Sequence, residues 1–181
     1  MAIDWTKMPN RRVHRVRWRC KQGKTSLTQR TLCLALYLRN QQIMERTLIL
    51  LKPDTVERQL VGTILSRFEQ KGLKIVAMRM LQFTPEIARR HYADHIDKPF
   101  YPGLEAYITS GHVIAAILEG PEVVSVVRQM IGPTNGIDAP SGTIRGDFAL
   151  SSQRNLVHAS DCTAAAEREM AIFFGESATT A

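Results

Sequence analysis

The sequence predicts one α/β sandwich of the split βαβ type, preceded by a basic leader. Three observations carry this prediction. The chain has 181 residues, 44% of them hydrophobic, which is enough for one domain with a sizeable core. From Met44 onward, segments with the period of strands alternate with segments of helical period. Residues 1–43, in contrast, show no sustained periodicity and contain ten basic residues and one acidic residue.

The first three elements of the body follow from apolar periodicity. Residues 47–51 form a compact β-forming run. Residues 59–71 place four apolar side chains on one helical face before the pattern stops at Gly72. Residues 73–83 alternate well enough to predict a second strand. The expected order is therefore strand, helix, strand.

The middle of the body predicts two helices, a strand and a third helix. Residues 84–86 (Thr-Pro-Glu) supply the cap, the first-turn proline and the acidic residue of a helix start, and this helix leads to Tyr92. The pattern of residues 100–110 is also helical. Residues 113–118 predict a buried strand, and residues 121–131 predict a helix that opens with a proline and a glutamate.

A long loop and two further elements complete the domain. Residues 132–147 contain four glycines and two prolines, and loops this long in compact domains are usually functional or disordered. A short strand at 156–157 and a helix at 163–174 follow, and a polar tail begins at Gly175. This order predicts an α/β (α+β) fold, a ferredoxin-like split βαβ sandwich whose mostly antiparallel four-stranded sheet is covered by helices.

The excess positive charge belongs to the leader alone. The whole chain has a formal charge of +7, whereas residues 1–43 carry +9 and residues 44–181, with fourteen basic and sixteen acidic side chains, carry −2. A nearly neutral body argues against a nucleic-acid-binding module, although such a sheet can host one. Nucleic acid binding is therefore expected only through the leader.

Two interpretations of the leader stay open. The abrupt change in composition favours Met44 as the native start, with residues 1–43 as upstream sequence. Arginine enrichment with hardly any acid also fits an organellar transit peptide. A secretory signal is disfavoured, because about thirty residues precede the apolar run 32–38 and no small-residue cleavage site follows it. We expect residues 1–43 to be disordered and residues 44–181 to form the domain.

Cysteine usage and hydropathy predict the compartment. No apolar run approaches the roughly 20 residues that cross a bilayer, so no membrane association is expected. The three cysteines are too few and odd in number for a disulfide framework. The sequence therefore predicts a cytoplasmic protein, or an organellar one if the leader is a transit peptide.

Two segments resemble known phosphate-binding and zinc-binding motifs, but each lacks required residues. Gly23-Lys24-Thr25 matches the end of a P-loop, but Trp18 stands where the first glycine of that motif belongs. His91 and His95 are four residues apart and could offer two metal ligands from one helical turn. The glutamate of the HExxH motif and a third ligand are missing, so we interpret both as surface histidines.

A strand-to-helix junction draws attention to His158. In the segment NLVHASD a short strand delivers the imidazole to its end, and Ser160 and Asp161 then start a helix. The helix start presents free backbone N–H groups beside a ring nitrogen that is able to act as a nucleophile. On this pattern alone, a functional histidine and an ordinary exposed histidine are about equally supported.

From Met44 to about Gly175 the chain resembles the nucleoside diphosphate kinase family. The segments that carry the resemblance occur in the family's order: ERTLILLKPD, RFEQKGLKIV, HYADH, KPFYPGL, TSG, TIRGDF and NLVHASD. It implies a ping-pong reaction in which the γ-phosphate of a nucleoside triphosphate, chiefly ATP, passes to a histidine and then to a nucleoside diphosphate. A neutral imidazole, with an unperturbed pKa of about 6.5, suits that role.

The resemblance also implies roles for individual residues. His158 aligns with the nucleophile, and Glu169 with the glutamate that orients it, with Ser160 as intermediary. Phe100 aligns with the ring on which the base stacks, a contact that any base can make. Tyr92 aligns with the tyrosine beside the transferred phosphate. The residues that align with contacts to the phosphates and sugar hydroxyls are Lys52, Arg128, Thr134, Arg145 and Asn155.

The resemblance implies Mg²⁺ as a cofactor, without a dedicated protein site. Magnesium would arrive on the nucleotide phosphates, because it keeps several waters and seldom needs an all-protein cage. A homo-oligomer, tetramer or hexamer, is also implied. The chain departs from the family pattern at four places, where it has Ala159, Cys162, the pair Gly136-Ile137 and His112. Of these, Ala159 would be strained if its φ were positive. A catalytically silent relative is disfavoured, because the site residues are present as a set.

Overall fold

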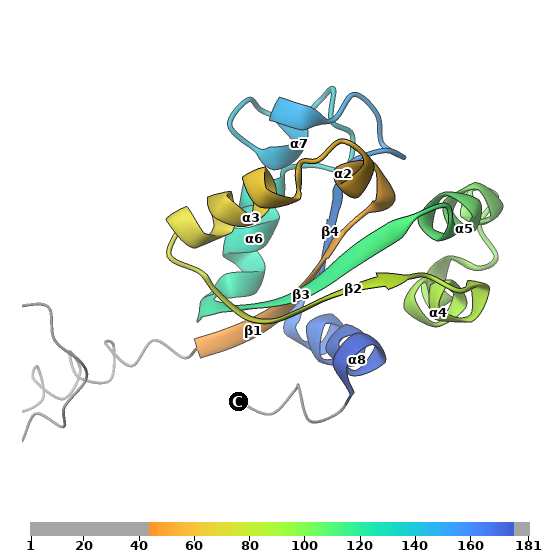
Figure 1. The fold of residues 1–181 in the computed structure, drawn as a ribbon, viewed down its shortest axis with the longest axis horizontal. Coiled ribbons are helices and arrows are strands. Elements are labelled where there is room, and N and C mark those ends of the chain that lie inside the picture. The colour runs from red at the N-terminus through yellow and green to blue at the C-terminus, as the bar shows by residue number, and fades with distance from the viewer. Residues whose placement is uncertain (1–43, 176–181) are drawn as a thin grey trace, which may run out of the picture. The chain divides into compact units, whose positions relative to one another are not determined.

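A computed structural model of the chain describes residues 44–175, whose strands form one four-stranded sheet in the order β2-β3-β1-β4 (Figure 1). All three neighbouring pairs are antiparallel. The strands are β1 (Met44–Leu51), β2 (Lys74–Gln82), β3 (His112–Pro121) and β4 (Val157–Ala159). The predicted ferredoxin-like sheet is thereby confirmed. The prediction of a disordered leader falls on residues outside the described range.

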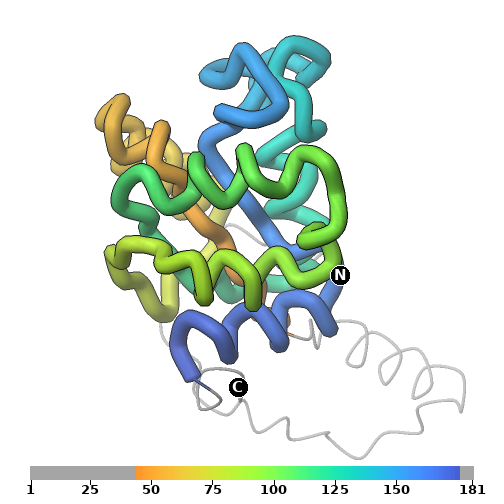
Figure 2. Tube along the Cα trace, turned by 90° about the vertical axis from the view of Figure 1, so that its right-hand side faces the viewer, coloured from red at the N-terminus to blue at the C-terminus, as the bar shows by residue number. Residues whose placement is uncertain are grey.

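Helices connect the strands and cover both faces of the sheet. They are α2 (Pro53–Glu57), α3 (Val61–Gln70), α4 (Pro85–His91), the 3-10 helix η2 (Ala93–His95), α5 (Tyr101–Thr109), α6 (Val123–Ile131), α7 (Ile144–Phe148) and α8 (Thr163–Phe174). Helices α3 and α6 lie on one face. Helices α4, α5 and α8 pack on the other face, as Figure 2 shows. Among residues 44–175, no helix is both long and apolar enough to cross a membrane.

The central strand β1 explains why two cores form. Residues 48–51 are fully buried, because successive side chains point to opposite faces and both faces are covered. Leu48 and Leu50 pack with Ala166 and Phe173 of α8, and Ile49 and Leu51 belong to the core under α3 and α6. β1 is therefore a rigid support for the strand beside it, β4.

Two short helices and one strand boundary differ from the sequence prediction. Helix α2 was not expected, and α7 occupies the end of a segment that was expected to be a loop. Each has only five residues, too few for apolar periodicity to identify a helix. α7 begins at the cap Thr143, whose hydroxyl accepts a hydrogen bond from Gly146 N at 3.1 Å. β4 covers Val157–Ala159 instead of the expected residues 156–157, so His158 lies at its centre rather than its end.

Candidate active site

A cleft of about 770 Å³ gathers the residues to which the family resemblance assigns nucleotide contacts. It is lined by Lys52, Tyr92, Phe100, Arg128, Thr134, Arg145, Asn155 and His158. These eight side chains come from eight different elements and connections, from the end of β1 to β4. A neighbouring hollow of about 830 Å³ contains Arg128 but no other member of this set. The smaller cleft is therefore the candidate active site.

The backbone that presents His158 is held in an unusual conformation. Leu156 has φ = 70°, in the left-handed region that side chains other than glycine rarely adopt. Three hydrogen bonds hold it: Leu156 N donates to Asp54 Oδ2 at 3.1 Å, and Leu156 O accepts from Lys52 N at 2.8 Å and from Thr55 Oγ1 at 2.6 Å. All three partners lie at the start of α2, so this short helix fixes the approach to β4.

Asp54, which was not predicted from the sequence to be a site residue, links the start of α2 to Leu156 and to α5. Its carboxylate is 2% exposed and accepts a hydrogen bond from Tyr107 Oη at 2.5 Å as well as from Leu156 N. Burial and the bond to Asp54 both raise the pKa of Tyr107 above its ordinary value. An acidic residue in the first turn of a helix is common, and its two partners are 53 and 102 residues away in sequence. No local signal could have identified its role.

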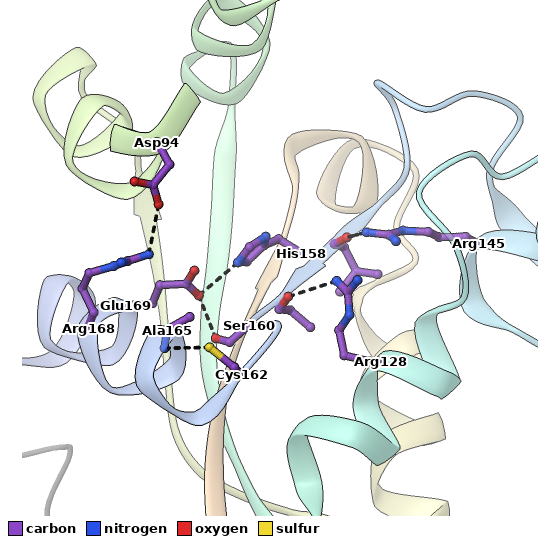
Figure 3. A network of polar contacts seen from close by, with 11 residues as sticks. Asp94, Arg128, Arg145, His158, Ser160, Cys162, Ala165, Arg168 and Glu169 are labelled. Carbon is purple, nitrogen blue, oxygen red and sulfur yellow. Dashed lines mark hydrogen bonds and ion pairs between the residues drawn. The ribbon is translucent and has the colours of Figure 1, made fainter. Parts of the chain in front are cut away.

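Glu169 contacts His158 directly (Figure 3), so the prediction that Ser160 is an intermediary between them is wrong. Glu169 Oε2 is 3.0 Å from His158 Nε2 and accepts a hydrogen bond from Ser160 Oγ at 2.7 Å. Burial alone would raise the pKa of Glu169, but the hydrogen bond and charge of His158 outweigh burial and lower it. An ionised Glu169 accepts, so the proton of the imidazole resides on Nε2 and Nδ1 keeps its lone pair.

Lys52 and Asn155 form a buried pair at the floor of the cleft. Lys52 Nζ donates to Asn155 Oδ1 at 2.7 Å, and Asn155 Nδ2 donates to the backbone carbonyl of Thr134 at 2.9 Å. Burial and the charge of Arg145 lower the pKa of Lys52 to about 8, although Asp54 acts in the opposite direction. The side chain of Thr134 lines the cleft, while its backbone positions Asn155.

Two arginines border β4 and point their guanidinium groups at its backbone (Figure 3). Arg145 donates to the carbonyls of Gly132 at 2.9 Å, Val157 at 2.7 Å and Asn155 at 3.4 Å. Arg128 donates to Ala159 O at 3.4 Å. Burial and the neighbouring charge of Arg128 lower the pKa of Arg145 to about 10. These backbone bonds fix the cations before any anion binds, which reduces the cost of ordering them.

The aromatic residues divide into an exposed ring and buried ones. Phe100 is 56% exposed at the side of the cleft, where a base could stack on it. Tyr92 is buried, and its hydroxyl has no hydrogen-bond partner within residues 44–175. Burial also raises its pKa above the ordinary value.

The prediction of two surface histidines is wrong for His91. His95 is exposed, but only 7% of His91 is exposed, and its ring lies 4.7 Å from that of His158 between centroids. Burial and the neighbouring His158 lower the pKa of His91 to about 3, against an opposing effect of Glu169. His91 is the last residue of α4, and its ring lies on the inward face of that helix, where it packs against Phe83 and Phe173. Spacing alone did not show which side of α4 is buried.

The departures from the family pattern are accommodated locally. Ala159 lies in β4 and is not among the residues with positive φ, so the strain considered for it does not arise. Cys162 caps α8, and its Sγ accepts a hydrogen bond from Ala165 N at 3.5 Å. His112 is exposed at the start of β3. A side chain at Gly136 would approach Ala149 O to 2.4 Å, so glycine is the residue that fits there.

Comparisons with known proteins find close sequence similarity over the described domain. A family model described as nucleoside diphosphate kinase matches residues 45–179. A nucleoside diphosphate kinase of Rhodopirellula baltica is 60% identical over 131 residues, which cover 72% of this chain and 86% of that protein. One from Thermus thermophilus is 54% identical over 131 residues, 72% of this chain and 96% of that protein.

A solved structure is similar as well. The nucleoside diphosphate kinase of Halobacterium salinarum in complex with CDP is 48% identical, with a TM-score of 0.71 over 72% of this chain and 87% of that one. The matched region contains every residue of the cleft. The chain therefore belongs to the nucleoside diphosphate kinase family, whose enzymes transfer the γ-phosphate of nucleoside triphosphates to nucleoside diphosphates by a ping-pong mechanism through a phosphohistidine.

Proposed function

We propose that His158 is the phosphate carrier of this enzyme, with ATP as the chief donor. One observation carries the proposal: Glu169 engages Nε2 of His158, and the ring also lines a cleft that contains Lys52, Arg128 and Arg145. With Nε2 occupied, Nδ1 is the ring nitrogen with a free lone pair. A nucleophile and three cations on one cleft fit phosphoryl transfer, in which charge is spread over the phosphate oxygens.

The first half-reaction loads the histidine. Nδ1 of His158 attacks the γ-phosphorus, the bond from that phosphorus to the β–γ bridging oxygen breaks, and the nucleoside diphosphate leaves with the electron pair. The ring then carries a positive charge, with its proton still on Nε2, and the carboxylate of Glu169 stabilises it. Ser160 holds the same carboxylate oxygen, which keeps Glu169 in position.

The second half-reaction reverses these steps. A terminal phosphate oxygen of the acceptor diphosphate attacks phosphorus, the N–P bond breaks and its electron pair returns to Nδ1. One cleft serves both nucleotides in turn, because the histidine stores the phosphoryl group between them. Arg145 and Arg128 are positioned to bind the charged oxygens, and Lys52 adds a compact cation at the floor.

The nucleotide is placed by the rest of the cleft. Phe100 offers an exposed ring for base stacking, and the pair Lys52 and Asn155 offers partners for the sugar hydroxyls. The CDP complex of the Halobacterium relative supports a nucleotide in this fold. No carboxylate of residues 44–175 lines the cleft, so Mg²⁺ would be held by the nucleotide phosphates and waters, and it would neutralise phosphate charge during transfer.

Assembly and location follow the family resemblance. We propose a homo-oligomer, tetramer or hexamer, and the exposed Met78 and Met80 on the edge strand β2 support a partner surface. We propose a cytoplasmic enzyme, or an organellar one if residues 1–43 act as a transit peptide. The domain would begin at Met44, where β1 begins.

Labelling tests the carrier directly. Brief incubation with γ-labelled ATP and Mg²⁺ should give an acid-labile, base-stable label on the protein, as a phosphohistidine does. His158→Ala should remove the label and lower kcat by at least about a thousandfold, because the nucleophile is gone. His95→Ala, which removes an exposed histidine from the same cleft, should still be labelled. A His158→Ala protein that carries the same label would refute the assignment.

A further inference from the structure

A second cavity, of about 290 Å³, shares His158 with the nucleotide cleft. His158, Tyr92, His95 and Arg128 border both cavities, but Glu169 and His91 line only this one. Two further carboxylates, Asp94 and Asp161, also line this cavity. Asp94 forms an ion pair with Arg168 at 3.6 Å. The phosphoryl transfer described above uses the contact between His158 and Glu169, but it gives no role to His91 or to the space that this cavity encloses.

Three potential metal ligands converge in this second cavity. One ligand atom each of His91, His158 and Glu169 lies within 4.8 Å of the other two. Within the cluster, His158 Nε2 is 3.0 Å from Glu169 Oε2. The two imidazole rings are 4.7 Å apart and nearly perpendicular, at 83°. Ligand atoms of a tetrahedral zinc site lie about 3.3 Å apart, so small side-chain rotations would bring the cluster to that geometry.

His91 supplies an independent indication of a ligand. Its ring is nine-tenths buried, yet neither Nδ1 nor Nε2 has a hydrogen-bond partner within residues 44–175. Its neighbours are the rings of Phe83, Tyr92 and Phe173, which offer it no acceptor or donor in this arrangement. A buried polar group that is left unpaired is costly, and such groups usually have a bound ion or water.

We propose that His91, His158 and Glu169 form a binding site for a transition-metal ion of the Zn²⁺ class. Two imidazoles and one carboxylate are a ligand set that zinc uses, with the fourth position left to water from the cavity. Mg²⁺ and Ca²⁺ prefer six or more oxygen ligands, so they would not occupy it. The site is distinct from the nucleotide-borne magnesium.

The position of the site predicts inhibition by zinc. A bound ion would take Nε2 of His158 and the carboxylate of Glu169, the proton of the neutral ring would move from Nε2 to Nδ1, and Nδ1 would lose the lone pair that accepts phosphate. Loading of His158 would then stop until the metal is removed. This consequence rests on the proposed role of His158, whereas metal binding itself does not.

Calorimetry with Zn²⁺ alone and absorption spectroscopy with Co²⁺ alone, both on the full chain, test the proposal. The expected result is one site with nitrogen and oxygen ligands that His91→Phe weakens at least about a hundredfold, since one of three ligands is lost. Phenylalanine suits the aromatic surroundings, and His91→Asn serves as a second variant. His112→Asn, which removes an exposed histidine at the start of β3, should bind as the unchanged protein does.

The outcomes separate this site from the proposed reaction. Equal zinc affinity in the unchanged protein, His91→Phe and His91→Asn would overturn the site, and so would the absence of binding in the micromolar range. In the labelling assay, micromolar Zn²⁺ should block labelling of the unchanged protein but not of His91→Phe. Zinc binding without any labelling would contradict the role of His158 as carrier and leave the metal site standing.

Discussion

Lys52 shows how a single side chain can set the pH range of the cleft. It is buried, and burial together with Arg145 brings its pKa from 10.5 down to about 8. The residue therefore keeps its charge at neutral pH and loses it within the mildly alkaline range. An anion in the cleft would favour the charged form.

The alkaline limb of kcat/KM should therefore have an apparent pKa near 8. This constant reports the free enzyme, in which rising pH removes the proton from Lys52 and weakens triphosphate binding. Between pH 8 and 10.5 the unfolded state binds more protons at Lys52 than the folded state does, so the contribution of Lys52 to the free energy of unfolding increases as pH rises. The loss of activity in this range is therefore not caused by an effect of Lys52 on unfolding.

Steady-state kinetics from pH 6 to pH 10 would measure this limb. Lys52→Arg, which keeps its charge, should move the limb to higher pH even where its absolute activity is lower. A profile of the unchanged enzyme that stays flat to pH 10 would show that the charge of Lys52 does not limit binding.

Candidate site residues could be predicted from the sequence where they belong to a continuous motif. His158, Lys52 and Arg145 stand in segments that resemble one family, and the structure brings them to one cleft. Asp54 and His91 were missed or misread, because their roles depend on contacts with β4, α5 and α8. Such contacts are set by packing, which one sequence does not display.

At the scale of elements, hydrogen bonds from the start of α2 hold Leu156, the residue directly before β4, in place. The left-handed Leu156 costs free energy that its three hydrogen bonds offset, and one of them ends on Asp54. Without these hydrogen bonds, the backbone at Leu156 could leave its left-handed conformation, and the imidazole of His158 would leave its position beside Glu169. The short helix thus connects fold stability to the reaction.

Asp54→Ala should lower the free energy of unfolding by about 2–4 kcal/mol and reduce kcat, since it leaves the buried Leu156 N and Tyr107 Oη unpaired. Tyr107→Phe removes only one of these bonds and should cost about 1 kcal/mol. Urea unfolding and kcat at a temperature where both variants are folded would measure the difference. Equal costs for the two variants would mean that the bond to Leu156 contributes little.

Two glycines in different elements should respond oppositely to alanine. At Gly136 the new Cβ would lie 2.4 Å from Ala149 O and 2.5 Å from Ala149 Cβ, so Gly136→Ala should destabilise the fold by about 1–3 kcal/mol. Gly62, in α3, has no atom within 4 Å of such a Cβ, and Gly62→Ala should stabilise by up to about 1 kcal/mol. Thermal unfolding measures both, and a stabilising Gly136→Ala would contradict the packing described.

Elements were predictable where periodicity extends over several turns or a whole strand. Strands β1, β2 and β3 and helices α3, α6 and α8 were expected within a few residues of their observed bounds. α2 and α7 were not, because five residues cannot show a helical period. Their formation depends on a first-turn proline and a threonine cap, which also occur in loops.

At the scale of the whole molecule, charge and structure divide near the same residue. The described domain begins at Met44, and it contains all residues of the cleft and of the second cavity. The excess of positive over negative charge in the sequence lies before this point. Activity and any binding of polyanions should therefore be separable.

A chain that begins at Met44 should keep the kcat/KM of the full chain, because every cleft residue remains. It should lose binding to duplex DNA, because its formal charge changes from +7 to −2. Kinetics and the salt dependence of DNA binding, compared between the two chains, would measure these effects. Equal DNA affinity with and without residues 1–43 would place the binding surface on the domain instead.

The two guanidinium groups along β4 have an effect beyond catalysis. Among residues 44–175, β4 is an outermost strand that pairs with β1, and the carbonyls of Val157 and Ala159 accept hydrogen bonds from Arg145 and Arg128. An open strand edge invites pairing with a second chain and aggregation. The two arginines that are proposed to bind substrate therefore also cover an open edge of the sheet, and a substitution that neutralises them should lower solubility as well as turnover.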